Sequence, residues 1–198
     1  KSAVTNPKSH HLFHASAGFY MSHFDEASCL VIDGSGSSED FITQTKTLKA
    51  NETTSIYEVS YPNEFNCTYK NYTVGVYDSN YNFTRDFYVN IDIAKADIDA
   101  FKRRVKTASY IDVSTKLDIG WKYTVVTSNI GFSKMCAEGK TMGLSAYGLR
   151  GDDSRARAAY KVQKELEATF VVRAGQCNSD NIVLSGGCAL NILGLSLI

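Results

Sequence analysis

The sequence HHLFHA at residues 10–15 is followed by the apolar run CLVI at residues 29–32 and by the turn DGSG at residues 33–36. In a helix, His10 and His14 lie on one face, within reach of a single metal ion. An aspartate at the end of a buried strand can supply a third ligand, and the glycines after it free backbone N–H groups to approach an anion. Together these features indicate an enzyme that acts on a phosphorylated or adenylylated substrate.

The metal-site interpretation depends on Asp33 more than on the histidines. Two histidines four residues apart on a helix are more often packing or surface residues than ligands. A carboxylate directly after a buried strand needs a partner to offset its desolvation, and Asp33 therefore favours the site. Two imidazoles and a carboxylate suit iron(II), zinc or manganese and leave positions open for substrate oxygens. We do not expect His11 and His23 to bind the metal; each would either contact a ligand side chain or lie on the surface.

The composition excludes some classes of partner. The chain has 198 residues, of which 43% are hydrophobic, 21 are basic and 21 are acidic. The balanced charge argues against broad attraction to nucleic acid or to an anionic membrane, and no apolar segment approaches the roughly 20 residues that cross a bilayer. Because the chain begins at Lys1 and stops at Ile198 inside an apolar pattern, we expect a fragment, whose missing signal peptide says nothing about export.

The cysteines predict a cytoplasmic protein with reduced thiols. Their number is odd and no C-x-x-C spacing occurs among them. They are Cys29, Cys67, Cys136, Cys177 and Cys188. Four glycosylation sequons point instead to secretion, but they lie in a Tyr/Asn/Thr-rich stretch where such triplets arise by chance. The sequons begin at Asn51, Asn66, Asn71 and Asn82.

Hydrophobic periodicity predicts an α/β fold. Helices are expected at residues 10–22, 93–106, 117–130, from about Met135, at 153–172 and from Cys188 onward, strands at 27–32 and 181–184, and a β region over 41–88. This order suits a ribonuclease H-like lobe, incomplete here. The first helix is expected to make apolar contacts through Leu12, Phe13, Ala17 and Tyr20.

Three segments have both a functional and an ordinary interpretation. The DGSG turn is either a phosphate seat or a hairpin turn. SGGCALN at residues 185–191 is either a helix N-terminus that binds an anion or a tight strand–helix turn. In the first case Asn191 could hydrogen-bond a ribose or carbamoyl group. EGKTMGLSAYG at residues 138–148 is not a P-loop, because the preceding glycine spacing is absent, and Lys140 lies either near an anionic ligand or in a surface ion pair.

Read together, these segments resemble the O-carbamoyltransferase family of nodulation and antibiotic-tailoring enzymes (NodU, CmcH and TobZ types). Residues 10–15 resemble its HHxxHA signature, and residues 119–132 resemble its SLGxxYxxxTxxLGF stretch. Residues 138–148 are similar to EGKxMGLxxYG, and residues 185–191 are similar to GGxALN. Each motif is weak alone, but their common order makes the resemblance strong.

The resemblance implies a set of site residues. His10, His14 and Asp33 would hold a divalent metal, iron in the first place, with zinc or manganese as alternatives. The groups that would bind carbamoyl-adenylate are Gly34, Ser35, Gly36, Lys140, Gly143, Gly186, Gly187 and Asn191. No side chain stands out as a nucleophile, which fits direct transfer to a hydroxyl acceptor, and the group that removes the hydroxyl proton is not identified.

The resemblance also implies a domain organisation. Residues 1–198 would be part of an actin-like transferase domain of the acetate/sugar kinase–actin type, with a possible insertion at residues 69–90. Family members use carbamoyl phosphate and ATP and form carbamoyl-adenylate in a YrdC-like domain, which this sequence lacks. A further metal-binding aspartate of the family would lie beyond residue 198, so we expect the fragment to be inactive alone.

Three alternatives remain open. A tRNA threonylcarbamoyl-transferase is disfavoured because a tRNA partner usually requires a basic face. A metal-dependent hydrolase of the H-E-x-x-H type is disfavoured because Leu12 and Phe13 stand between the histidines. A non-catalytic module that binds a nucleotide or a metal is the third. We expect no nucleic acid or membrane partner, and the sequence does not identify the acceptor.

Overall fold

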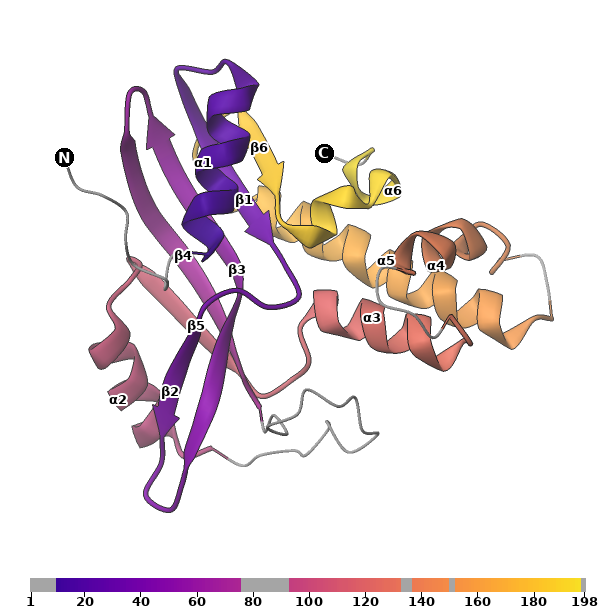
Figure 1. Cartoon of the computed structure of the whole chain (residues 1–198), viewed down its shortest axis with the longest axis horizontal. Coiled ribbons are helices and arrows are strands. Elements are labelled where there is room, and N and C mark those ends of the chain that lie inside the picture. The colour runs from indigo at the N-terminus through magenta and orange to yellow at the C-terminus, as the bar shows by residue number, and fades with distance from the viewer. Residues whose placement is uncertain (1–9, 76–92, 133–136, 150–151, 197–198) are drawn as a thin grey trace.

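The computed structural model describes residues 10–75, 93–132, 137–149 and 152–196 of the chain. Its helices flank a strongly twisted sheet (Figure 1). In chain order the elements are α1 (His10–Ser22), β1 (Glu26–Ile32), β2 (Ser38–Ile42), β3 (Thr47–Ser60), β4 (Glu64–Gly75), α2 (Lys95–Val105), β5 (Tyr110–Ser114), α3 (Ile119–Asn129), α4 (Glu138–Ser145), α5 (Ser154–Ala174), β6 (Ile182–Ser185), the 3-10 turn η1 (Gly187–Leu190) and α6 (Ile192–Leu195). The expected α/β class is therefore confirmed.

Strand β1 is buried between two neighbouring strands. The strand order is β5-β4-β3-β1-β6, and β2 pairs with β3. β1 is antiparallel to β3 and parallel to β6, and six of its seven residues are buried. A strand covered on both faces has a continuous apolar sequence, as residues 27–32 do. Because β1 and β6 are parallel, their carboxyl ends bring Asp33 and Gly186 to the same edge of the sheet.

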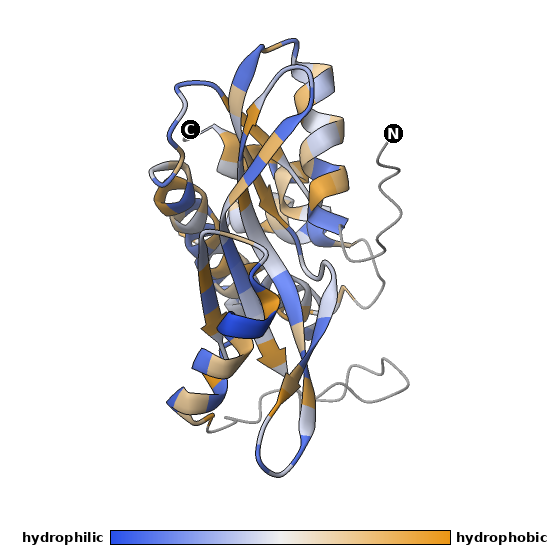
Figure 2. Ribbon diagram, turned by 90° about the vertical axis from the view of Figure 1, so that its left-hand side faces the viewer, coloured by the Kyte–Doolittle hydropathy of each residue, from blue (hydrophilic) through white to orange (hydrophobic). Residues whose placement is uncertain are grey.

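Helix α1 covers one face of β1, and helices α3 and α5 cover the other. Side chains alternate between the faces of a strand. Val31 accordingly lies in a core cluster with Ala15 of α1. Ile32 lies in another cluster with Tyr123 of α3 and Leu166 of α5. A third cluster packs α2 against the far part of the sheet. Figure 2 shows hydrophobic residues along the strands and along the helices that pack against them.

The structure corrects two predicted elements and adds one. The helix expected from Cys188 is a short 3-10 turn followed by the one-turn helix α6. Asn191 adopts an extended conformation between them and caps α6 by accepting a hydrogen bond from the Gly194 N–H, which interrupts the helix. The expected apolar side of α1 is also largely wrong, because Phe13, Ala17 and Tyr20 are exposed. Strand β5 was not expected, since its five residues include a single buried one.

The buried side of α1 includes a histidine. Leu12 is partly buried. The fully buried residues of α1 are His11, Ala15 and Phe19, which repeat every four residues. This spacing forms one continuous helix face.

Part of the expected insertion belongs to the sheet. Residues 69–75 form the second half of β4, which pairs with both β3 and β5. Residues 76–90 lie outside the described residues, as do Asn82 and the expected helix start at Met135. The insertion stays a prediction.

The structure shows the state of the described cysteines and the exposure of the described sequon asparagines. Cys29, Cys67, Cys177 and Cys188 are free thiols. Of the sequon asparagines, Asn51 and Asn71 are buried, whereas Asn66 is exposed. Across the part of the chain that the structure describes, no helix combines the length and the hydrophobicity needed to cross a bilayer.

A bulge in β3 places two polar residues side by side beneath α1. The register with β4 shifts between Glu52 and Thr54. An extra residue of this kind re-aims the side chains around it, so that residues three apart can share a face. Ser55 donates a hydrogen bond of 2.8 Å to Oε1 of Glu52, and Nζ of Lys70 lies 2.6 Å from the same oxygen. Glu52 and Lys70 thus form an ion pair whose side chains are 0% and 7% exposed.

The charges of this pair compensate each other. Burial would raise the pKa of Glu52, but His11 and Lys70 lower it below its ordinary value. Burial would lower the pKa of Lys70, and Glu52 raises it instead. Burial lowers the pKa of His11 to about 4, despite the opposing effect of Glu52. The imidazole is therefore neutral near pH 7, and Lys70 carries the charge that balances Glu52.

We expect Lys70→Met to lower the free energy of unfolding by about 3–5 kcal/mol near pH 7, because it leaves an ionised carboxylate buried without a cation. Urea denaturation measures this change. Without Lys70, burial raises the pKa of Glu52, and protonation then removes the uncompensated charge, so the difference between wild type and variant should shrink as the pH falls below neutral.

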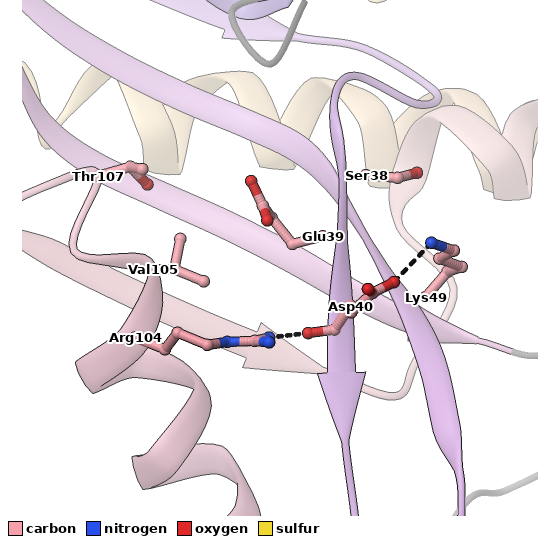
Figure 3. A pocket seen from close by; sticks show the side chains of 7 residues that line it. All are labelled: Ser38, Glu39, Asp40, Lys49, Arg104, Val105 and Thr107. Carbon is pink, nitrogen blue, oxygen red and sulfur yellow. Dashed lines mark hydrogen bonds and ion pairs between the residues drawn. The ribbon is translucent and has the colours of Figure 1, made fainter.

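The matched control is Lys49→Met. Lys49 and Asp40 form an ion pair of 2.5 Å with both side chains more than half exposed. The pair borders a surface pocket where Arg104 also donates to the Asp40 carbonyl (Figure 3). Exposed pairs contribute about 0–1 kcal/mol, so the control should lose less than about 1 kcal/mol. Equal losses in the two variants would contradict burial as the cause.

Candidate metal centre and adjoining cavity

Three side chains converge where β1 ends. His10 and His14 come from α1, and Asp33 follows β1. Nε2 of His10 lies 3.0 Å from Oδ2 of Asp33, and Nε2 of His14 lies 3.4 Å from the same oxygen. The two Nε2 atoms are 3.1 Å apart. The structure thus brings together all three residues that the sequence suggested as metal ligands.

The separations and the chemistry of these groups fit a divalent ion. Ligand atoms bound to tetrahedral zinc at 2.0–2.1 Å are about 3.3 Å from one another. The side chains of His10, His14 and Asp33 are 46%, 38% and 18% exposed, so an ion can reach them. Burial would raise the pKa of Asp33, but hydrogen bonds from His10 and from the Gly34 N–H lower it below its ordinary value. The carboxylate is therefore ionised at neutral pH, as a metal ligand must be.

Backbone amides hold the other oxygen of Asp33. Oδ1 accepts hydrogen bonds from the N–H of Gly34 at 2.8 Å and of Gly187 at 3.3 Å. Gly186 has a φ of +87°, and a Cβ there would lie 2.5 Å from the Ile32 carbonyl oxygen. Glycine is therefore required at this position, and it lets the turn after β6 close over Asp33.

The amides that were expected to receive a phosphate are engaged within the protein. Those of Gly34 and Gly187 hold Asp33, and that of Gly36 donates to the Glu52 carbonyl at 2.6 Å. Ser35 is exposed. In this structure the two glycine turns therefore position Asp33 against the sheet, and their contact with a ligand stays a prediction.

A cavity of about 490 Å³ opens next to Asp33. This volume is within the usual range for small-molecule sites. Its apolar wall includes Met142 of α4 and Leu166 of α5, and its polar wall includes Asp33, Thr124 of α3 and Glu138 of α4. Thr124 donates a hydrogen bond of 2.9 Å to Oε1 of Glu138. The cavity is thus lined by both turns of the site and by the three helices α3, α4 and α5.

Asn191 lines this cavity with its amide already paired. Its Nδ2 donates to Oε1 of Gln163 at 2.8 Å, and its Oδ1 accepts from Nε2 of Gln163 at 3.0 Å. The same Oδ1 accepts from the Gly194 N–H. Tyr123 donates its hydroxyl hydrogen to Gln163 as well. In the structure, Asn191 therefore supports the cavity wall, and its bond to a ribose or carbamoyl group stays a prediction.

Two predicted ligand-binding residues of α4 lie away from the cavity. Lys140 and Gly143 are exposed and do not line it, and Nζ of Lys140 lies 5.8 Å from the centre of the Phe132 ring. Glu138 and Met142 are four residues apart and share one face of the helix, whereas Lys140 is midway between them and points elsewhere. This spacing could have identified Glu138 from the sequence.

The first turn of α3 touches the Asp33 turn through backbone. A Cβ on Gly120 would lie 2.8 Å from Cα of Gly34 and 2.9 Å from the Asp33 carbonyl oxygen. Asp118 caps α3 by accepting from the Gly120 N–H. The missing side chain at residue 120 therefore allows α3 to approach the site.

Comparison with known families decides the assignment. A model of the carbamoyltransferase N-terminus matches residues 3–171, which is most of the chain. The chain belongs to this carbamoyltransferase family. Neither a curated protein nor a solved structure gives a match. The matched range includes all three residues of the candidate metal centre and α4, whereas the Gly186–Gly187 turn of this carbamoyltransferase domain lies outside it.

We expect Gly186→Ala in the carbamoyltransferase domain to cost more than about 2 kcal/mol of unfolding free energy, because it combines a strained φ with a steric clash. Gly143→Ala is the control, since nothing lies within 4 Å of a Cβ there. Alanine favours a helix interior, so this variant should be neutral or up to about 1 kcal/mol more stable. Urea denaturation of both variants checks the prediction, and a neutral Gly186→Ala would contradict it.

Proposed function

We propose that the full-length protein transfers a carbamoyl group from carbamoyl-adenylate to a hydroxyl of a small-molecule acceptor, with the help of a divalent metal. Carbamoyl phosphate and ATP would supply the adenylate. The observation that carries this proposal is the double role of Asp33. Its Oδ2 faces His10 and His14, while the residue also lines the cavity. A metal held there would lie at the edge of the space that a donor can fill.

Each group of the chain has a defined task in this proposal. His10, His14 and Asp33 would hold the metal, iron in the first place. When bound, the metal would supply a Lewis acid that polarises the carbamoyl carbonyl or binds the phosphate. Gly34 and Gly187 keep the Asp33 carboxylate oriented through their amides. Glu138 and Thr124 offer a carboxylate and a hydroxyl oxygen to ligand hydroxyl groups.

The same proposal includes the domain organisation. The antiparallel strands β1, β3 and β4, with β6 parallel to β1, support a ribonuclease H-like lobe of an actin-like domain. A YrdC-like domain of the full-length protein would form the carbamoyl-adenylate, and we place the reaction in the cytoplasm.

We expect His14→Ala in the full-length protein to reduce carbamoyl transfer at least about a hundredfold, because it removes a metal ligand. The side chain of His14 is 38% exposed, so folding should be nearly unchanged. Transfer of radiolabelled carbamoyl from carbamoyl phosphate to a panel of sugars and simple alcohols, with ATP, measures the effect.

The control for this experiment is His23→Asn. His23 is exposed and has a φ of +63°, a conformation that asparagine tolerates. It should retain both activity and stoichiometric metal. Full activity in His14→Ala would remove the metal from the proposal, and wild-type protein without stoichiometric metal would favour a non-catalytic module.

A further inference from the structure

A third histidine of α1 lies between the two proposed ligands and is buried. His11 is 0% exposed, and its Nδ1 lies 2.8 Å from Oγ of Ser55. Ser55 in turn contacts Glu52, which pairs with Lys70. These four residues, His11, Ser55, Glu52 and Lys70, form a continuous buried network from α1 through β3 to β4.

The direction of the hydrogen bonds follows from the carboxylate. An ionised Glu52 can only accept, so the Ser55 hydroxyl donates to it. Nδ1–H of His11 therefore donates to Ser55, and its Nε2 carries no hydrogen in the neutral ring. Nε2 has no partner among the described residues and faces Gly36, where a Cβ would lie 2.7 Å away. The ring is thus held between the sheet and the turn that follows Asp33.

Hydrophobicity alone does not determine which side of α1 faces the sheet. Phe13, Tyr20 and Met21 are 54%, 49% and 79% exposed, so the helix has apolar residues on its outer side as well. Its first and last turns contain no acidic residue and no lysine or arginine. A polar network that pairs with one side of the helix can therefore select its rotation.

The rotation of α1 matters for the metal centre. A helix with its side chains has a radius of about 5–6 Å, so a rotation of about 20° moves a histidine nitrogen at that radius by about 2 Å. The ligand atoms are 3.0–3.4 Å apart, and such a shift would separate them from Asp33.

We propose that His11 is a positioning residue, which fixes the rotation of α1 through Ser55, Glu52 and Lys70 and so brings His10 and His14 to Asp33. This proposal rests on the metal site proposed above. The proposal gives a reason for burying His11 and its polar partners, because an apolar side chain could fill the same space in the core. Burial of an ion pair is weak evidence for a gain in stability, so a role in geometry is the better explanation.

The test compares Ser55→Val with Ser55→Thr in the full-length protein. Both variants add the same branched shape to the strand, but only threonine keeps the hydroxyl that links His11 to Glu52. The probe is Zn²⁺ alone, with its dissociation constant measured by calorimetry, together with the visible absorption of the Co²⁺-substituted protein. Urea denaturation reports the stability of each variant.

We expect Ser55→Val to bind Zn²⁺ at least tenfold more weakly than wild type and to show an altered Co²⁺ spectrum, with Ser55→Thr close to wild type. Equal affinities and spectra in the two variants would overturn the positioning role, even if Ser55→Val were less stable. A wild type that binds no divalent ion would instead overturn the metal site, and the proposal with it.

A second variant keeps the test decisive if Ser55→Val does not fold. His11→Leu replaces the ring with an apolar helix-forming residue and leaves Ser55 to pair with Glu52. We expect it to fold and to lose at least tenfold in Zn²⁺ affinity. Unchanged affinity in this variant would also overturn the proposal.

Discussion

The carboxylate of Asp33 joins three separate segments of the chain, and the site depends on this group. One oxygen faces the imidazoles of α1, and the other accepts amide hydrogens from the turns after β1 and after β6. Parallel pairing of β1 with β6 makes this possible, because it ends both strands at one edge. The carboxylate is thus oriented by backbone donors, and its remaining oxygen stays directed at the histidines. In the proposed metal site, a carboxylate fixed in this way would lose little conformational entropy on binding an ion.

Buried polar groups support this arrangement from the neighbouring face of the helix, where His11 lies. The bulge between Glu52 and Thr54 brings Glu52 next to Ser55, and Lys70 of β4 neutralises the carboxylate. His11 completes the network with a neutral ring. Isolated buried charges are costly, so each member needs the others in place. The polar residues of the sheet therefore favour one rotation of α1 about its axis, although the helix also has apolar residues on its exposed side.

Local patterns in the sequence were enough to predict the parts of the site that depend on spacing. His10 and His14 share a helix face through their four-residue separation, and Asp33 follows a continuous apolar strand. The burial of His11 could not be predicted, because it depends on a bulge in a strand 44 residues away. Likewise, Asn191 finds its amide partner 28 residues earlier in α5. Expectations failed where distant partners, rather than neighbours in sequence, satisfy a polar group.

The backbone contact between Gly120 and Gly34 couples the position of α3 to that of the loop that carries Asp33. Helix α3 lines the cavity through Tyr123 and Thr124, and its first turn rests directly on the loop that carries Asp33. No side chain lies between them to absorb a displacement. Any compound that shifts α3 as it enters the cavity would therefore also shift the loop that carries Asp33. By thermodynamic reciprocity, any factor by which a ligand in the cavity changed the affinity of the proposed metal site would also be the factor by which the metal changed the affinity for that ligand.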